Sequence, residues 1–338
     1  MTKHQSCIKM SFDESPVLLY AHPSMSQLAQ EIVDKCTLLH TGQTNSSPKR
    51  SIERSLSFTT AGPRSVEFRE TIQWGKFADG FPNLFIKDVK YMAGKDVIFI
   101  GSFHSPEIIF EQLSVLYMFP RYLARSFHFI LPYFPTGTME RVDTEGQIAT
   151  AKTLATLLSA IPLTTKGPAQ ICVFDIHALQ ERFYFSESII PRLESAVPLL
   201  LKEVQTLEDK ERIAFAFPDD GACKRFHHFF PEQEPITCVK IRDGSKRIVK
   251  VKDGNPEGKH VIIIDDLVQT VSAYVTHPVF PNNSWQRFVN SDVKFENFWI
   301  TDSIPHGREI AKHKPFKLLS LCESIAEMLM GYDLLPYQ

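Results

Sequence analysis

The predicted fold depends most on one stretch, HVIIIDDLVQTVSAYVTH, residues 260–277. An apolar run ends in two aspartates, Asp265 and Asp266, and a second strand-like run begins at Val271. Such runs are typical of buried strands in a mainly parallel sheet, whose carboxyl edge gathers ligands. Paired carboxylates there suit sugar hydroxyls or a metal ion. Because neighbouring parallel strands need a crossover of about a dozen residues, we expect LVQT to form at most a tight hairpin that reverses the second strand.

The composition of the chain indicates a folded globular protein. Its 338 residues suffice for two domains, and 43% of them are hydrophobic. The formal net charge of −2 does not indicate the basic surface that is typical of nucleic-acid-binding proteins. No apolar window approaches the roughly 20 residues that cross a bilayer, so we expect no nucleic-acid or membrane partner. The start lacks an apolar signal-peptide core and the six cysteines show no CxxC spacing, which favours reduced thiols and a cytoplasmic location.

Apolar runs alternate with helical patterns along most of the chain. We predict strands at 16–23, 96–102, 126–134, 170–178, 212–220 and 297–305, and helices at 24–39, 105–124, 145–161 and 320–332. This alternation predicts an α/β fold with mainly parallel sheets. Residues 41–65, rich in Ser and Thr, are expected to be a surface insertion. The stretch TTKGPAQ predicts a boundary between domains 1–165 and 166–338.

Polar residues at the ends of the predicted strands are expected to share one edge. Asp175 and His177, two residues apart at one strand end, suit a magnesium-bound phosphate or water; a capping aspartate and a hydrogen-bonded histidine fit equally well. Asp219 in FPDDGACKRF precedes a predicted helix, and the same motif carries Lys224 and Arg225. That pattern suits phosphate or metal binding, or a simple N-cap.

Two further segments could contact a nucleotide. Residues 238–260 are rich in Lys and Arg and could close on a polyphosphate as a cationic flap, although charge runs are often simply solvated. Phe77 in FADGFPNLF could stack on a base. No nucleophile elbow or Walker loop occurs, so the pattern favours phosphoryl-type transfer by positioning and electrostatics.

Eight motifs, in this order along the chain, resemble those of the ribose-phosphate diphosphokinases: FADG, PYFPTGTMERV, DIHALQERFYF, FPDDGACKRF, VKIRDGSKR, VIIIDDLVQ, THPVF and TDSIP. The likeness covers about residues 66–330 and is closest in wording to the plant-type class II members. It implies two phosphoribosyltransferase-like domains and Mg²⁺ as cofactor. It also implies that ATP donates its diphosphoryl group to ribose 5-phosphate, giving AMP and 5-phosphoribosyl 1-diphosphate.

The resemblance implies roles for individual residues. His177 and Asp219 would bind Mg²⁺–ATP, with Asp175 nearby as a further metal ligand. Phe77 and Asp79 would contact adenine across a subunit interface, which implies a homo-oligomer or a hetero-oligomer with homologues. The remaining assignments are Arg141 to ATP, Lys240 and Arg242 to catalysis, and Asp265 and Asp266 to the ribose hydroxyls.

One part of the family pattern is missing. In the family DDLVQ continues as SGGT, the loop that cradles the 5-phosphate, and then as a helix; here Gln269 is followed by Thr270 and directly by Val271. Three explanations stay open: a natural deletion or splice form, an omitted segment, or a rearranged regulatory homologue. The alternative to an active enzyme is therefore a catalytically impaired subunit that binds nucleotide and associates with active homologues.

Overall fold

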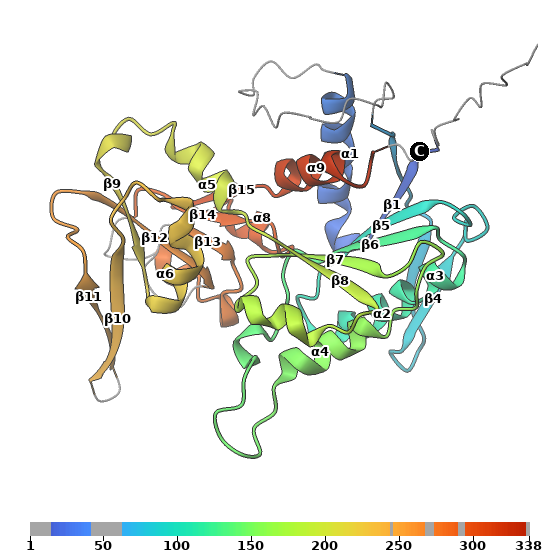
Figure 1. The fold of residues 1–338 in the computed structure, drawn as a ribbon, viewed down its shortest axis with the longest axis horizontal. Helices are drawn as coiled ribbons and strands as arrows, with labels where there is room; N and C mark the ends of the chain where they lie inside the picture. Colours follow the sequence, from blue (N-terminus) through green and yellow to red (C-terminus); the bar gives the residue numbers. More distant parts are fainter. Residues whose placement is uncertain (1–14, 42–62, 244–245, 268–273, 290–294, 336–338) are drawn as a thin grey trace, which may run out of the picture.

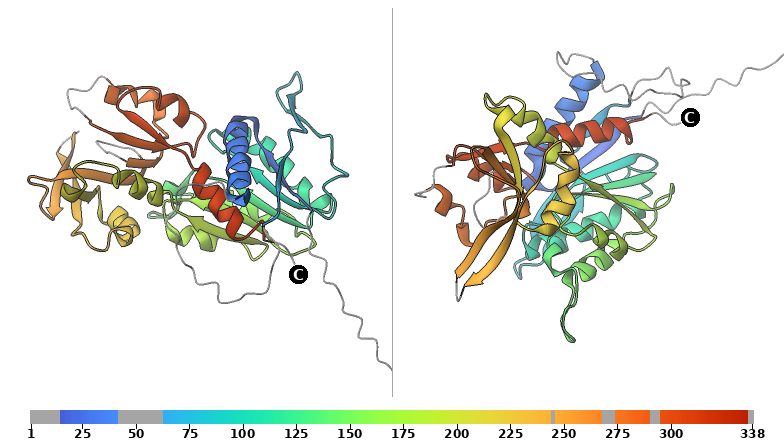
Figure 2. Two further views of the ribbon diagram at one scale, coloured as in Figure 1. Left: turned by 90° about the horizontal axis from the view of Figure 1, so that it is seen from above. Right: turned by 60° about the vertical axis from the view of Figure 1, so that its left-hand side comes forward.

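The computed structural model describes residues 15–41, 63–243, 246–267, 274–289 and 295–335, with backbone alone at 240–243, 246–249 and 267. Two sheets flanked by helices form two units that lie side by side (Figures 1 and 2). The insertion predicted at 41–65 and the junction after Gln269 fall almost entirely outside these ranges.

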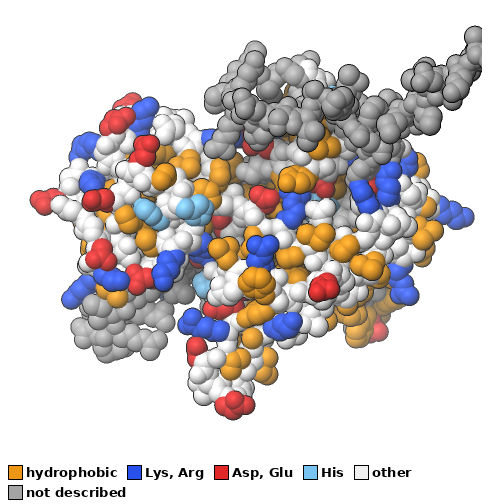
Figure 3. Space-filling view, viewed as in Figure 1, with side chains coloured by type: hydrophobic (Ala, Val, Ile, Leu, Met, Phe, Trp, Pro, Cys, Tyr) orange, Lys and Arg blue, Asp and Glu red, His pale blue; other side chains and the backbone are white. Residues whose placement is uncertain are grey.

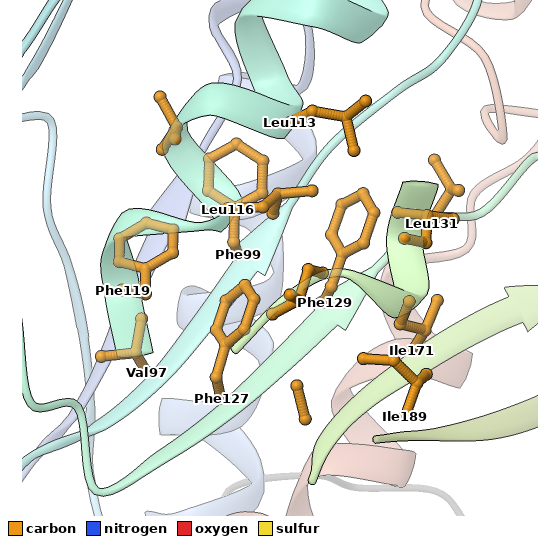
Figure 4. Packing of buried hydrophobic residues seen from close by; sticks show 14 of the residues in the cluster. Val97, Phe99, Leu113, Leu116, Phe119, Phe127, Phe129, Leu131, Ile171 and Ile189 are labelled. Atoms are coloured by element: carbon orange, nitrogen blue, oxygen red, sulfur yellow. The ribbon is translucent and has the colours of Figure 1, made fainter. Parts of the chain in front are cut away.

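The first sheet is parallel throughout and has the strand order β2-β1-β5-β6-β7-β8. Its strands are β1 (Val17–Ala21), β2 (Val66–Phe68), β5 (Asp96–Ile100), β6 (Ser126–Ile130), β7 (Ala169–Phe174) and β8 (Ile189–Glu194). Most of these runs are continuously apolar, because both faces of the sheet are covered. One face packs its phenylalanines against α2 (Pro106–Leu116) and α3 (Met118–Arg121), with α4 (Thr150–Ser159) beside them (Figures 1 and 4).

The second sheet has the order β11-β10-β9-β12-β13-β14-β15. Its strands are β9 (Ile213–Phe217), β10 (Ile236–Asp243), β11 (Lys246–Asp253), β12 (His260–Leu267), β13 (Tyr274–His277), β14 (Phe298–Thr301) and β15 (Phe316–Leu319). All neighbours are parallel except β10 and β11. Its helices are α5 (Val197–Val204), α6 (Asp220–Phe226), α7 (Gln286–Val289) and α8 (Gly307–Ile310). The predicted α/β class with mainly parallel sheets is confirmed.

The expected reversal of the strand after Asp266 is wrong, because β12 and β13 are parallel. Ile264 pairs with Tyr274, and Leu267 pairs with His277. The described part of β13 comprises Tyr274–His277, and Tyr274 lies beside Ile264 rather than beside the end of β12. Because Tyr274 pairs with Ile264, three residues before Leu267, the end of β12 and the described start of β13 are offset along the strand by about 10 Å at 3.3 Å per residue.

The first sheet continues past the boundary predicted after residue 165. In that sheet β7 pairs with β6 and β8 pairs with β7, and TTKGPAQ forms the end of the connection from α4 and the start of β7. The last helix, α9 (Cys322–Gly331), also returns to this unit and lies beside α1 (Ser26–Thr41) (Figures 1 and 2). Ile325 and Leu329 share a buried cluster with Leu28 and Ile32. The first unit is thus built from both ends of the chain.

Two smaller expectations can be compared with the described ranges. None of the helices there is long and apolar enough to cross a membrane. Five cysteines in those ranges, Cys36, Cys172, Cys223, Cys238 and Cys322, are free thiols, as expected.

Candidate functional site

A cavity of about 540 Å³ lies where the carboxyl edges of the two sheets meet. Its lining comes from residues 138–141 and 177–180 of the first unit, and from 219–225 and Asp265-Asp266 of the second. The edges are joined directly, since His277 Nε2 lies 3.1 Å from the carbonyl oxygen of Phe174 and Thr276 Oγ1 donates to Asp175 at 2.7 Å. Most of the polar strand ends therefore meet, but across two sheets rather than along one.

A buried carboxylate organises the centre of the cavity. Asp266 accepts from His177 Nδ1 at 2.8 Å and from Arg225 at 2.5 Å. The hydrogen bond from His177 and the charge of Arg225 outweigh burial and hold the pKa of Asp266 well below its usual range. The same hydrogen bond raises the pKa of His177 above its ordinary value.

Arg225 holds this arrangement in place, a role that the sequence analysis did not predict. Its guanidinium also donates to the carbonyl oxygens of Ile176 and His177, at 3.1 and 2.5 Å. The motif FPDDGACKRF placed Lys224 and Arg225 together as phosphate candidates. In the structure Lys224 is exposed, whereas Arg225 holds the His177 backbone and Asp266.

Asp175 does not line the cavity, so it does not share a side with His177 as its spacing suggested. β7 ends at Phe174, and Asp175 adopts a φ of 38°, so the alternation of a strand does not continue through it. Its oxygens accept from Ser195 Oγ (2.6 Å), the Ala196 amide (3.0 Å) and Thr276 Oγ1. These bonds give Asp175 a role in joining the two units.

Asp219 and Asp265 line the cavity beside His177. Asp219 caps α6 by accepting from the Ala222 amide at 2.9 Å, as its N-cap pattern predicted. Within the described ranges no three His, Cys, Asp or Glu residues are arranged to hold a metal ion. Magnesium, however, usually keeps several waters and binds through one or two carboxylates and substrate phosphates. Asp219 and Asp265 fit that mode, whereas the predicted ligand Asp175 does not.

The cavity wall at residues 137–141 carries Arg141. Its side chain is largely exposed and pairs with Asp143 at 3.1 Å. The wall approaches the opposite loop closely, because a Cβ on Gly137 would lie 2.9 Å from the Cβ of His177. Arg141 and His177 are therefore brought to one cavity, as predicted.

Glu181 is a buried acid that the sequence analysis missed. It lies in the short helix η3 (Leu179–Tyr184) and is 1% exposed. Its Oε1 accepts from the Ala178 amide at 3.0 Å, and burial raises its pKa to about 7. Glutamate at the first turn of a helix is ordinarily a cap, and nothing in the sequence marked this one as buried.

In the described part of the structure, four of the predicted site residues do not line the cavity. Phe77 and Asp79 lie in the exposed turn between β3 (Ile72–Lys76) and β4 (Pro82–Ile86), on the far side of the first unit from β10 (Figure 1). Lys240 and Arg242 lie on β10, which pairs with β11 as a hairpin, and their side chains are outside the described part.

Fold and site together define an α/β protein with a polar cavity between two mainly parallel sheets. Residues 17–161 match the family described as the N-terminal domain of ribose phosphate pyrophosphokinase. The chain is 47% identical to ribose-phosphate pyrophosphokinase 4 of Arabidopsis thaliana, with 77% of this chain and 84% of that protein aligned. It is 48% identical to the rice protein of the same name, covering 81% and 92%. The chain belongs to the ribose-phosphate pyrophosphokinase family and resembles its plant members.

A further relative supports this assignment, and a solved structure has a similar fold. Ribose-phosphate pyrophosphokinase 3, chloroplastic, of Arabidopsis thaliana is 44% identical over 93% of this chain and 80% of its own length. The crystal structure of phosphoribosylpyrophosphate synthetase from Mycobacterium smegmatis superposes with a TM-score of 0.70 at 18% identity, covering 93% of this chain and 98% of that one. That likeness concerns the fold.

Proposed function

We propose that this chain is a ribose-phosphate diphosphokinase, which transfers the diphosphoryl group of ATP to ribose 5-phosphate. The proposal rests on the cavity that joins His177, Asp219 and Arg141 to the Asp265-Asp266 pair. Cationic and acidic side chains around one cavity suit a polyphosphate donor and a sugar acceptor. Holding both in line provides most of what phosphoryl transfer requires of a protein.

The residues that line the cavity would have different roles in binding the two substrates. Asp266, which His177 and Arg225 hold in place, would orient the imidazole, and Asp265, which lines the same cavity, would contact the ribose hydroxyls. Arg141 carries positive charge toward the phosphates. Mg²⁺ would be held by Asp219 and His177 with the phosphates of ATP, whose negative charge it would neutralise. Lys240 and Arg242 would reach the same phosphates from β10, the edge of the flap.

We propose that the working enzyme is a homo-oligomer, or a hetero-oligomer with homologues, in which a second copy supplies Phe77 and Asp79. The turn that carries them lies away from the cavity of its own chain, and its phenylalanines, such as Phe81, are exposed. Hydrophobic side chains also lie exposed over the lower centre of the face in Figure 3, where Figure 1 places α4. Exposed apolar surface of this kind marks association sites.

We also propose that the two units are phosphoribosyltransferase-like domains, whose sheets divide after β8 at Glu194. A cytoplasmic location is also proposed, although the names of two plant relatives place those proteins in the mitochondrion and the chloroplast.

A second candidate function is a catalytically impaired regulatory subunit. Six residues separate Leu267 from Tyr274, where the family carries SGGT and a helix. The alignment with the rice relative runs over 298 positions but contains 81% of the 338 residues, about 274, so about 24 positions have no residue opposite them. This difference supports a missing segment without locating it. Such a subunit would bind ATP but not ribose 5-phosphate.

The deciding experiment measures AMP formation by the purified protein from ATP and ribose 5-phosphate with Mg²⁺. Turnover that is lost in Arg141→Ala supports the enzyme. No AMP above background, with ATP binding intact by calorimetry, refutes it and supports the regulatory subunit. A chimera that carries the rice relative's segment between Gln269 and Thr270 tests the cause. It should gain turnover if the missing phosphate loop is the reason for inactivity.

A further inference from the structure

A second cavity lies beside the catalytic cavity, at the junction of the two units. Its volume is about 400 Å³, and Leu179 and Arg225 line both cavities. The hydrophobic part of its lining comes from both units: Ile176, Leu179 and Leu193 belong to the first, and Pro198, Phe226 and Phe229 to the second. Junctions between domains are common places for small-molecule sites. A ligand in this cavity would therefore contact both units.

Four hydrophobic side chains around this cavity keep surface that a ligand can reach. Leu179 and Pro198 are exposed, and Leu193 and Phe229 are half-buried. The rings of Phe229 and the exposed His228 have their centroids 4.1 Å apart, so part of the wall is aromatic. Covering such surface is favourable by about 25 cal/mol per Å² of apolar area removed from water. The walls therefore favour a hydrophobic ligand with a flat ring.

The two acids of the lining already have partners in the protein. Asp175 is 5% exposed, and it accepts from Ser195 Oγ at 2.6 Å and from Thr276 Oγ1 at 2.7 Å. Glu194 lies 3.4 Å from the guanidinium of Arg192. A cationic ligand would have to compete with these donors for the two carboxylates, so the cavity does not favour a cation.

The basic groups of the lining do not favour an anion either. Arg225 donates to Asp266 at 2.5 Å and to the carbonyl oxygens of Ile176 and His177. The lining carries two carboxylates against this guanidinium and the exposed imidazole of His228, which gives no excess of positive charge. Anions are bound where cationic donors are free to pair with them. An uncharged ligand therefore fits the lining best.

We propose that this cavity binds an uncharged aromatic compound. A volume of about 400 Å³ lies within the range of small-molecule sites, roughly 300–1,000 Å³. The compound would contact Leu179 and Leu193 of the first unit and Pro198 and Phe229 of the second, and so hold the two units together. Such binding needs neither ATP nor turnover, so the proposal does not depend on the diphosphokinase reaction.

Fluorescence titration with N-phenyl-1-naphthylamine tests the site, because this uncharged probe becomes brighter in apolar surroundings. The full-length protein should bind one probe per chain with a Kd below about 100 μM. Pro198→Trp, at an exposed position, should fill the cavity and weaken binding about tenfold or more. Pro198→Ala leaves the cavity open, and Arg141→Ala changes only the catalytic cavity, so both controls should bind the probe as wild type does. No saturable binding, wild-type affinity in Pro198→Trp, or loss of binding in either control would each overturn the proposal.

A matched ligand tests the preference for an uncharged compound. The probe 8-anilino-1-naphthalenesulfonate has the same rings and carries a sulfonate in addition. The binding that Pro198→Trp removes should be about tenfold weaker, or less, for this anion. Equal or tighter binding of the sulfonate at this site contradicts the proposed ligand class.

A second copy of the chain is the other possible occupant, and sedimentation distinguishes it. The mass of the wild-type protein should be the same with and without the uncharged probe, and Pro198→Trp should have the same mass. If Pro198→Trp instead lowers the mass, and the affinity for the probe falls as the protein concentration rises, a second copy covers the cavity and the proposal is wrong.

Discussion

Replacing Arg225 by methionine should destabilise the protein more than any nearby surface change. Asp266 has a 3% exposed side chain and takes its two partners from Arg225 and His177. Without Arg225 one oxygen of a buried carboxylate loses its partner, and the carbonyl oxygens of Ile176 and His177 lose their donor. Breaking one side of a buried ion pair costs about 3–5 kcal/mol. We expect a loss of this size in the free energy of unfolding at pH 7.

Urea unfolding followed by circular dichroism measures the loss, and Lys224→Met is its control. Lys224 is the exposed neighbour on the same helix, so its replacement should change stability by less than about 0.5 kcal/mol. The pKa of Asp266 is lowered on folding, so its ionised form stabilises the protein above the unfolded value near 4. The contribution is lost as pH falls, and the gap between Arg225→Met and wild type should narrow below pH 4. Equal stability of the two variants at pH 7 would refute the reasoning.

Three further substitutions test other parts of the site. Burial raises the pKa of Glu181 to about 7, so ionisation of this side chain destabilises the folded protein as the pH rises from 4.5. The free energy of unfolding of Glu181→Gln relative to wild type should therefore increase by about 2–3 kcal/mol between pH 4 and pH 8. The exposed control Glu187→Gln should show no such increase. A pH-independent difference contradicts this. Gly137→Ala places a methyl group against His177, so it should lower the free energy of unfolding by about 1–3 kcal/mol and raise the KM for ATP. An unchanged melting temperature and KM would count against the close contact. Asp175→Asn should cost about 1–3 kcal/mol without changing the Mg²⁺ concentration for half-maximal rate, whereas a raised requirement would restore Asp175 as a metal ligand.

The sequence predicted the parallel strands well, because strands buried on both faces must be apolar and their ends must carry the polar residues. It therefore placed His177 and Asp266 at a common site. It misjudged Asp175, because a positive φ just after the strand changes the direction of the side chain, and no spacing rule reports that angle. It misjudged the direction of β13, because a short connection was expected to place the second strand beside the end of β12, whereas Tyr274 pairs with Ile264.

Arg225 and Glu181 show a different limit. Arg225 and Lys224 are adjacent and chemically alike in the sequence, and only the rotation of α6 decides which one faces Asp266. A buried glutamate is recognised from the packing of two distant loops, which local pattern does not contain.

The return of α9 to α1 has a consequence for the order of folding. Leu321, Ile325 and Leu329 belong to the same buried cluster as strands β1 and β5, so synthesis of the first sheet does not complete its core. The part of that apolar face that α1 does not cover stays exposed on the ribosome until α9 emerges. Since exposed apolar strands invite aggregation, we expect a fragment ending at Glu194 to associate with chaperones during synthesis. The second unit must then be synthesised before α9 can complete the core of the first unit.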